Sequence, residues 1–219
     1  MKIIVVQKDA NNLKLSPFLK KAKKAGADLV CFGELATTGC LYEPREIPPL
    51  DSFLDQIDKS GLRVTFGTPL QTNSGLRNAY VYRHKGEQQE YFKINLFAPM
   101  NEPDIYEAGN ESGLFESDLG RLGAAICYDI RFPDLFDRIA EKKPDLVLIP
   151  AAFPSARIGD WRSLLVERAL QVDCPVVGIN AVGDDGTNEF GGCSAAVNSY
   201  SEILAQADEV SETLLEIEI

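Results

Sequence analysis

Three chemically reactive residues stand beside short apolar segments of this sequence. Glu34 follows the apolar run 29–32, Lys93 lies among aromatic and aliphatic residues, and Cys127 follows the apolar run 122–126. A thiol at a strand-to-helix turn can act as a nucleophile, because backbone N–H groups of such a turn can hold an oxyanion. A partly desolvated carboxylate suits general base work. Together the three residues offer a nucleophile, a base and a cation.

Each of these residues also has an ordinary structural explanation. Free cysteine is among the most buried residue types and packs cores. A glutamate at a strand end is often solvated, and a lysine on an edge strand can extend its ammonium group to water. Only the combination of Glu34, Lys93 and Cys127 indicates catalysis.

Imidazole catalysis is a poor fit. The sole histidine, His84, lies in the polar stretch RHKGE, which predicts a hairpin turn. Because a turn tip is a poor place for a buried base, carboxylates and lysines must supply any acid–base chemistry.

The elements that must position these side chains follow from hydrophobic patterning. Short runs rich in β-branched residues, bounded by Gly, Pro, Asp or Asn, predict buried strands at 3–6, 29–32, 64–66, 79–82, 122–126, 146–149, 176–179 and 195–197, with a final strand at 216–219. Helical spacing predicts helices over 16–26 with Ser16 as its cap, 134–142 opened by Pro133, and 161–172 capped by Asp160. This mixture predicts an α/β sandwich in one domain, residues 1–219. The segments 26–32 and 143–149 each follow a helix and read as equivalent strands.

Composition excludes several classes of protein. The 219 residues include 22 Lys+Arg and 33 Asp+Glu, a net charge of −11, which disfavours binding to nucleic acid or an anionic membrane. The first apolar run is too short for a signal peptide, and no run is long enough to cross a bilayer. The five scattered cysteines form no CxxC pair, so we expect a cytoplasmic protein without disulfides, metal or cofactor.

Three local motifs carry a family resemblance. They are GELATTG (33–39), FKINLF (92–97) and GAAICYDIRFP (123–133), followed by weaker likeness at 161–169 and 180–183. In this order and spacing, from about residue 2 to 218, the chain resembles the nitrilase superfamily of carbon–nitrogen hydrolases, and specifically its amidase and ω-amidase branch. The resemblance implies an α-β-β-α sandwich with four layers and homodimerisation.

The resemblance also implies a mechanism for hydrolysis of a small amide. Glu34 takes the proton of Cys127, Cys127 attacks the carbonyl carbon, and Lys93 with the backbone N–H of Tyr128 stabilises the oxyanion. A thioester forms, ammonia or an amine leaves, and water regenerates the enzyme. The loop from 98 to 110 matches the one that carries the family's second glutamate, here Glu102.

Arg131 occupies the offset at which relatives that cleave N-carbamoyl amino acids bind the substrate carboxylate. A guanidinium suits bidentate recognition of a carboxylate, so an amide with a distal carboxylate is favoured. The alternative for Arg131 is an ion pair with Asp134 or Asp137. Other functions left open are N-carbamoyl hydrolysis, nitrile cleavage, acyl transfer to an amine, and an idle binding or scaffold protein of the same fold.

Overall fold

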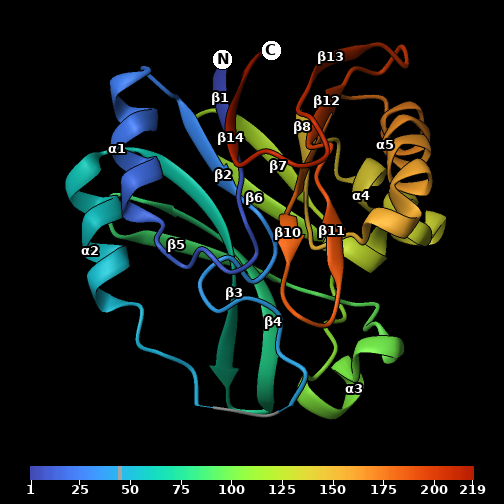
Figure 1. Ribbon diagram of the computed structural model, residues 1–219. Helices are drawn as coiled ribbons and strands as arrows, with labels where there is room; N and C mark the ends of the chain where they lie inside the picture. Colours follow the sequence, from blue (N-terminus) through green and yellow to red (C-terminus); the bar gives the residue numbers. More distant parts are fainter. Residues whose placement is uncertain (44–45) are drawn as a thin grey trace.

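Two six-stranded sheets form the centre of the computed structural model, which describes residues 1–43 and 46–219 (Figure 1). In the first sheet, of order β14-β1-β2-β3-β4-β5, the strands β1 to β3 run parallel and the remaining neighbours antiparallel. Its strands are β1 (Lys2–Gln7), β2 (Leu29–Phe32), β3 (Arg63–Thr72), β4 (Gly75–His84), β5 (Glu87–Phe92) and β14 (Thr213–Glu218).

The second sheet has the order β13-β12-β9-β8-β7-β6, with β7 to β9 parallel. Its strands are β6 (Gly113–Ser117), β7 (Gly120–Ala124), β8 (Leu146–Ala151), β9 (Val176–Asn180), β12 (Ala195–Val197) and β13 (Ile203–Gln206). A separate hairpin pairs β10 (Val182–Asp184) with β11 (Glu189–Gly191).

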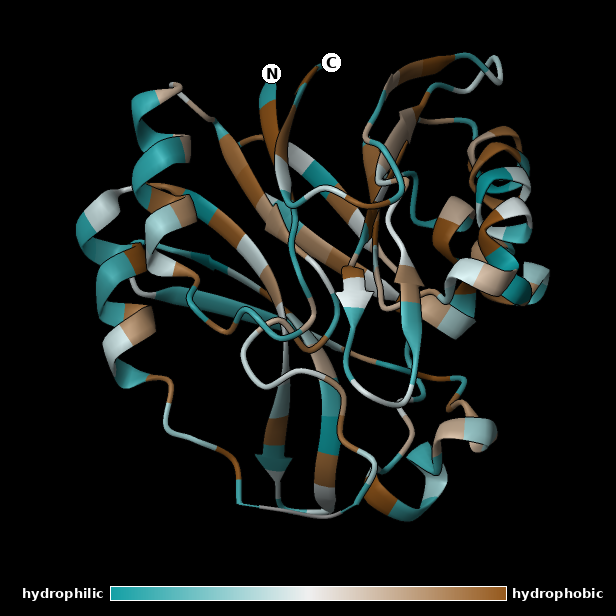
Figure 2. Ribbon diagram, viewed as in Figure 1, coloured by the Kyte–Doolittle hydropathy of each residue, from teal (hydrophilic) through white to brown (hydrophobic). Residues whose placement is uncertain are grey.

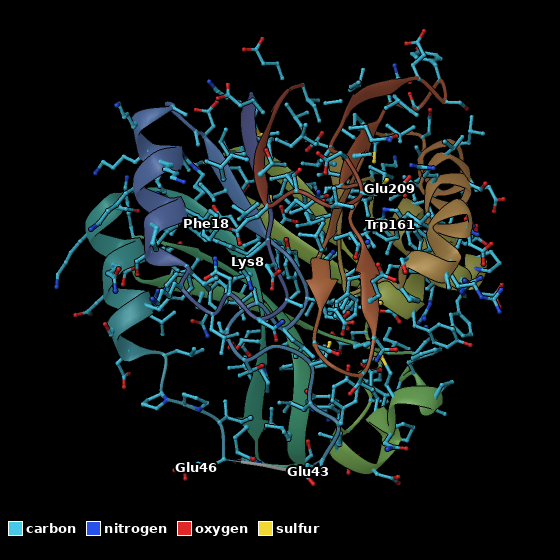
Figure 3. All side chains as sticks on the ribbon, in the orientation of Figure 1. Lys8, Phe18, Glu43, Glu46, Trp161 and Glu209 are labelled. Atoms are coloured by element: carbon cyan, nitrogen blue, oxygen red, sulfur yellow. The ribbon has the colours of Figure 1, made fainter. Side chains whose placement is uncertain are left out.

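Helices cover the outer face of each sheet. The first sheet is covered by α1 (Ser16–Lys24) and α2 (Asp51–Ser60), and the second by α4 (Pro133–Glu141) and α5 (Ile158–Val172). Figure 3 labels Phe18 on α1 and Trp161 on α5, two buried side chains between these helices and the sheets. The helix α3 (Glu102–Ile105) is one short turn beside the cavity described below. No helix in the described part of the chain is long and apolar enough to cross a membrane.

Alternation along the strands produces the layers. In β1, Ile3 and Val5 join the core between the two sheets, whereas Ile4 and Val6 join the core beneath α1 and α2. Strands buried on both faces read as continuous apolar runs, which Figure 2 shows as brown strands between helices with mixed colours. The predicted α-β-β-α sandwich with four layers is therefore confirmed.

The sheets repeat one topology. Each has three parallel strands linked by two helices, with an antiparallel strand before the first and after the third. The segments 26–32 and 143–149 lead into β2 and β8, the middle strands of the two parallel sets, so their predicted equivalence is confirmed.

The predicted strands are present, and the turn after His84 joins β4 to β5. Two predicted helix caps are wrong. Ser16 is the first residue of α1 and makes no capping hydrogen bond, and α5 begins at Ile158, which places Asp160 inside its first turn. Leu15 already has helical dihedral angles and occupies the cap position before Ser16, and α5 begins two residues before Asp160, directly after the 3₁₀ turn Ser155–Arg157.

Candidate active site

A cavity of about 350 Å³ opens where the ends of the parallel strands of both sheets meet. This is the edge of a sheet at which ligands bind in open α/β folds. The six residues predicted from the sequence all line it: Glu34, Lys93, Glu102, Cys127, Tyr128 and Arg131.

Glu34 lies two residues beyond β2, in a turn that β3 holds in place. The backbone N–H of Gly67 donates to the Gly33 carbonyl at 3.0 Å. A Cβ atom on Gly67 would lie 2.4 Å from the Leu35 nitrogen and 2.6 Å from the Glu34 Cα atom. Only glycine permits this approach, so Gly67 helps to set the position of the Glu34 carboxylate.

The ammonium group of Lys93 is bound by two carboxylates. Lys93 Nζ donates to Glu34 Oε1 and to Glu102 Oε1, both at 2.8 Å, and the Lys93 side chain is 1% exposed. The remaining carboxylate oxygens accept backbone N–H groups. Glu34 Oε2 accepts from Ala152 at 3.0 Å and Glu102 Oε2 from Phe97 at 2.6 Å. Such pairing offsets the desolvation cost of each buried charge.

These charges shift one another's ionisation. Burial alone would lower the pKa of Lys93, but the Glu34 and Glu102 carboxylates outweigh burial and hold that pKa well above its usual value. Burial raises the pKa of Glu102, and Lys93 opposes this rise. Lys93 is therefore a fixed cation inside the cavity.

Cys127 begins the short 3₁₀ turn Cys127–Arg131 that follows β7. Its φ of 47° lies in the left-handed region, which is unusual for a residue other than glycine and occurs at strained functional turns. Tyr128 follows in the first turn, where backbone N–H groups have no acceptor within the helix. Its ring contacts those of Phe97 and Phe132, with centroids 4.9 and 5.2 Å away.

The Asp129 carboxylate fixes this turn against the segment around Lys93, which directly follows β5. Oδ2 accepts the Ile126 N–H at 2.9 Å and the Tyr91 hydroxyl at 2.7 Å. Oδ1 accepts both the backbone N–H and the side-chain amide of Asn95, each at 2.8 Å. Asp129 therefore joins the segment before Cys127 to the residues on either side of Lys93.

Burial, and then the Glu34 charge, raise the pKa of the Cys127 thiol well above its usual value, whereas Lys93 and the Ala152 backbone amide lower it. The thiol is consequently protonated before substrate binds, and nucleophilic attack requires that a base remove its proton.

Arg131 lines the cavity but forms a different ion pair from the predicted one. Its guanidinium donates to Asp160 Oδ2 at 2.8 Å and lies over the Phe153 ring, 5.4 Å from the centroid. The alternative pairing with Asp134 or Asp137 is wrong, because both residues are exposed on α4 and Asp137 accepts a hydrogen bond from Gln171 on α5.

Two contributors were missed in the sequence. Asn78 on β4 donates to Glu34 Oε1 at 2.9 Å, and Arg157 lines the cavity beside Arg131. Asn78 directly precedes the apolar run 79–82, and this position at the start of a predicted strand was the available signal. Among the described residues, no group of three or more His, Cys, Asp or Glu side chains is placed to hold a metal ion.

Comparison with known proteins agrees with this geometry. The family model "Carbon-nitrogen hydrolase" matches residues 1–219. The chain is 31% identical over 214 residues to 2-oxoglutaramate amidase of Bacillus subtilis (strain 168), covering 91% of this chain and 81% of the relative. It is 34% identical over 201 residues to omega-amidase YafV of Escherichia coli (strain K12), covering 89% of this chain and 78% of the relative.

Solved structures show the same fold. The CN-hydrolase superfamily protein XC1258 from Xanthomonas campestris superimposes with a TM-score of 0.86 at 26% identity, covering 100% of this chain and 90% of that chain. Nit3 of Saccharomyces cerevisiae, a nitrilase superfamily member, superimposes with a TM-score of 0.85 at 22% identity, covering 100% and 90%.

Fold and sequence together define an α-β-β-α hydrolase of carbon–nitrogen bonds. The chain belongs to the carbon–nitrogen hydrolase family. It is an enzyme that hydrolyses the C–N bond of amides.

Proposed function

We propose that the protein hydrolyses a small linear amide through a thioester on Cys127, with Glu34, Lys93 and Cys127 as its catalytic triad. The observation that carries this proposal is the Lys93 ammonium group, buried between Glu34 and Glu102 at 2.8 Å from each, in the same cavity that Cys127 lines. If this ion pair served only to fill space, apolar side chains of similar volume would fill it better.

In the first half-reaction Glu34 accepts the Cys127 proton as sulfur attacks the amide carbon. The C=O electron pair moves to oxygen, and Lys93 with the Tyr128 N–H stabilises that oxyanion. The tetrahedral intermediate collapses, the C–N bond breaks, and the leaving nitrogen takes the proton from Glu34. In the second half-reaction Glu34 removes a proton from water and the hydroxide adds to the thioester carbon. The C–S bond then breaks, Glu34 returns the proton to the Cys127 sulfur, and the acid product leaves. Glu102 orients Lys93 throughout.

Arg131 favours a substrate with a distal carboxylate, because its guanidinium group lines the cavity. The relatives named 2-oxoglutaramate amidase and omega-amidase support the same substrate class. N-carbamoyl hydrolysis and nitrile cleavage would use the same triad, and an assay panel that includes both substrate types distinguishes them.

The test compares Cys127→Ala with Cys174→Ala, a control at a buried cysteine away from the cavity. On a panel of small amides, Cys127→Ala is expected to abolish ammonia release, whereas Cys174→Ala retains it. Mass spectrometry of wild-type enzyme quenched during turnover is expected to detect an acyl group on the Cys127 peptide. Undiminished turnover in Cys127→Ala would refute Cys127 as the nucleophile, whereas a wild-type protein that hydrolyses no amide of the panel would be better explained as an idle scaffold.

We further propose that residues 1–219 act as one cytoplasmic domain that forms a homodimer. Apolar side chains exposed on the second sheet and its helix support dimerisation, among them Leu170 on α5 and Ile203 on β13, which are 55% and 54% exposed. Light scattering of the purified protein measures the oligomeric state.

A further inference from the structure

The cavity has charges of opposite sign in its two parts. In the buried part, Lys93 is enclosed by the Glu34 and Glu102 carboxylates, so that these three groups sum to one negative charge. Among the residues that the structure describes, the other charged ones that line the cavity are Arg131 and Arg157, the side chains of which are 33% and 67% exposed. The two guanidinium groups therefore mark the mouth of the cavity.

A single carboxylate serves both arginines. Asp160, in the first turn of α5, accepts from Arg131 at 2.8 Å and lies 3.6 Å from an Arg157 nitrogen. The hydrogen bond from Arg131 lowers the pKa of Asp160, so Asp160 is ionised at neutral pH. Two cations share one anion, which leaves one positive charge at the mouth without a partner among these residues.

Arg131 is held by more than its ion pair. The Phe153 ring lies beneath its guanidinium, and the Phe153 backbone is fixed by Asn180, which accepts the Phe153 N–H at 2.7 Å and donates to its carbonyl at 3.2 Å. The rest of the lining is mostly apolar, with Met100, Phe190 and other side chains that suit a short hydrocarbon chain.

We propose that Arg157 is a specificity-determining residue that, together with Arg131, binds an anionic group at the far end of the substrate, with Asp160 as the counter-ion of both arginines in the free enzyme. This inference rests on the proposed amidase function. The preferred substrate is an amide with a short apolar spacer, a terminal carboxylate and no cationic group beside that carboxylate. An ammonium group at that position would face two guanidinium groups of the same charge. Among the described residues, the only carboxylates that line the cavity are Glu34 and Glu102, and Lys93 already neutralises these in part.

The experiment measures kcat/KM for two amides of equal length, one ending in a carboxylate and one ending in a methyl group. Arg157→Ala is expected to lower the ratio of acidic to neutral kcat/KM about three- to tenfold, since its contact with substrate is partly screened by water. Asp160→Asn keeps an acceptor for Arg131 but removes the negative charge, so the same ratio is expected to rise about threefold.

Arg121→Ala is the matched control, because Arg121 pairs with Glu116 at the start of β7, at the opposite end of that strand from Cys127. Its ratio is expected to equal that of the wild type. A third substrate, with an ammonium group beside the carboxylate, is expected to be a poorer substrate than the simple acidic amide.

The result that overturns the inference is an unchanged ratio in Arg157→Ala, with turnover of the neutral amide intact. That outcome differs from failure of the proposed function itself, in which wild-type enzyme would hydrolyse neither amide. If Arg157→Ala lowers kcat/KM equally for both amides, Arg157 has a general structural role and the inference is likewise wrong.

Discussion

Replacing Lys93 with methionine tests the central ion pair of the cavity. Methionine fills a similar space without a charge, so the Lys93→Met variant leaves two carboxylates in a site where the native side chains are 1%, 3% and 6% exposed. At a separation of 2.8 Å and an effective dielectric constant of about 20, each lost contact corresponds to roughly 6 kcal/mol of Coulomb energy. Glu34 and Glu102 retain their hydrogen bonds from Asn78, Ala152 and Phe97, so the expected net loss in the free energy of unfolding is about 3–5 kcal/mol.

The loss should depend on pH in a defined direction. Burial already raises the pKa of Glu102 above its ordinary value of 4.5, and removal of Lys93 raises it further. A group with a raised pKa in the folded state stabilises the fold below its unfolded pKa and loses that contribution as pH rises through the folded pKa. The deficit of Lys93→Met relative to wild type is therefore smallest near pH 4 and grows toward pH 8.

Urea unfolding followed by circular dichroism at several pH values measures this deficit. The control is Lys59→Met, which removes an exposed pair with Asp55 on α2 and is expected to cost less than about 1 kcal/mol at every pH. Loss of an oxyanion partner should also lower kcat by about 10²–10³ in Lys93→Met. A deficit below about 1 kcal/mol, or one equal at pH 5 and pH 8, would refute the reasoning about buried charge.

Three other perturbations test the supports of the site. The Asp129→Asn variant has an amide in place of the carboxylate that accepts these hydrogen bonds. We therefore expect a loss of about 1–3 kcal/mol in unfolding free energy and at least a tenfold fall in kcat. Gly67→Ala should destabilise the fold and lower kcat/KM, whereas Gly159→Ala, where a Cβ atom meets nothing within 4 Å, should do neither; equal effects would contradict the packing argument. Peptide mapping after brief exposure to an amide-like electrophile should find Cys127 labelled first, and Glu34→Gln should slow this labelling; an unchanged rate would exclude Glu34 as the base.

The sequence was sufficient to predict the parallel strands and the residues at their ends. Runs such as 29–32 and 146–149 are buried on both faces, and this produces an uninterrupted apolar pattern. Residues just beyond such runs must lie at one edge of a sheet, which is why Glu34 and Cys127 were identified. Helix α2 and strands β5, β6, β10, β11 and β13 were missed, because these strands are short or carry polar residues, as in EQQEYF of β5.

Pairings between distant elements could not be predicted. The partner of Arg131 lies 29 residues along the chain, on α5, and not on the helix that follows it directly. Sequence proximity favoured Asp134, but the orientation of a side chain at a turn depends on which helix packs over that turn. Asn78 was missed for the same reason, because its contact with Glu34 depends on the pairing of β4 with β3 and on the close approach of Gly67 in β3 to Glu34.

The repeated topology of the two sheets has a consequence for how this enzyme could be divided. Glu34 and Lys93 belong to the half built on the first sheet, and Cys127 belongs to the half built on the second. Strand β14, at the end of the chain, returns to pair with β1, so the first half depends on the second for a complete sheet. A chain cut between β5 and β6 would yield two fragments that are each inert, and activity would return only on reassembly, which makes this protein suitable as a split reporter.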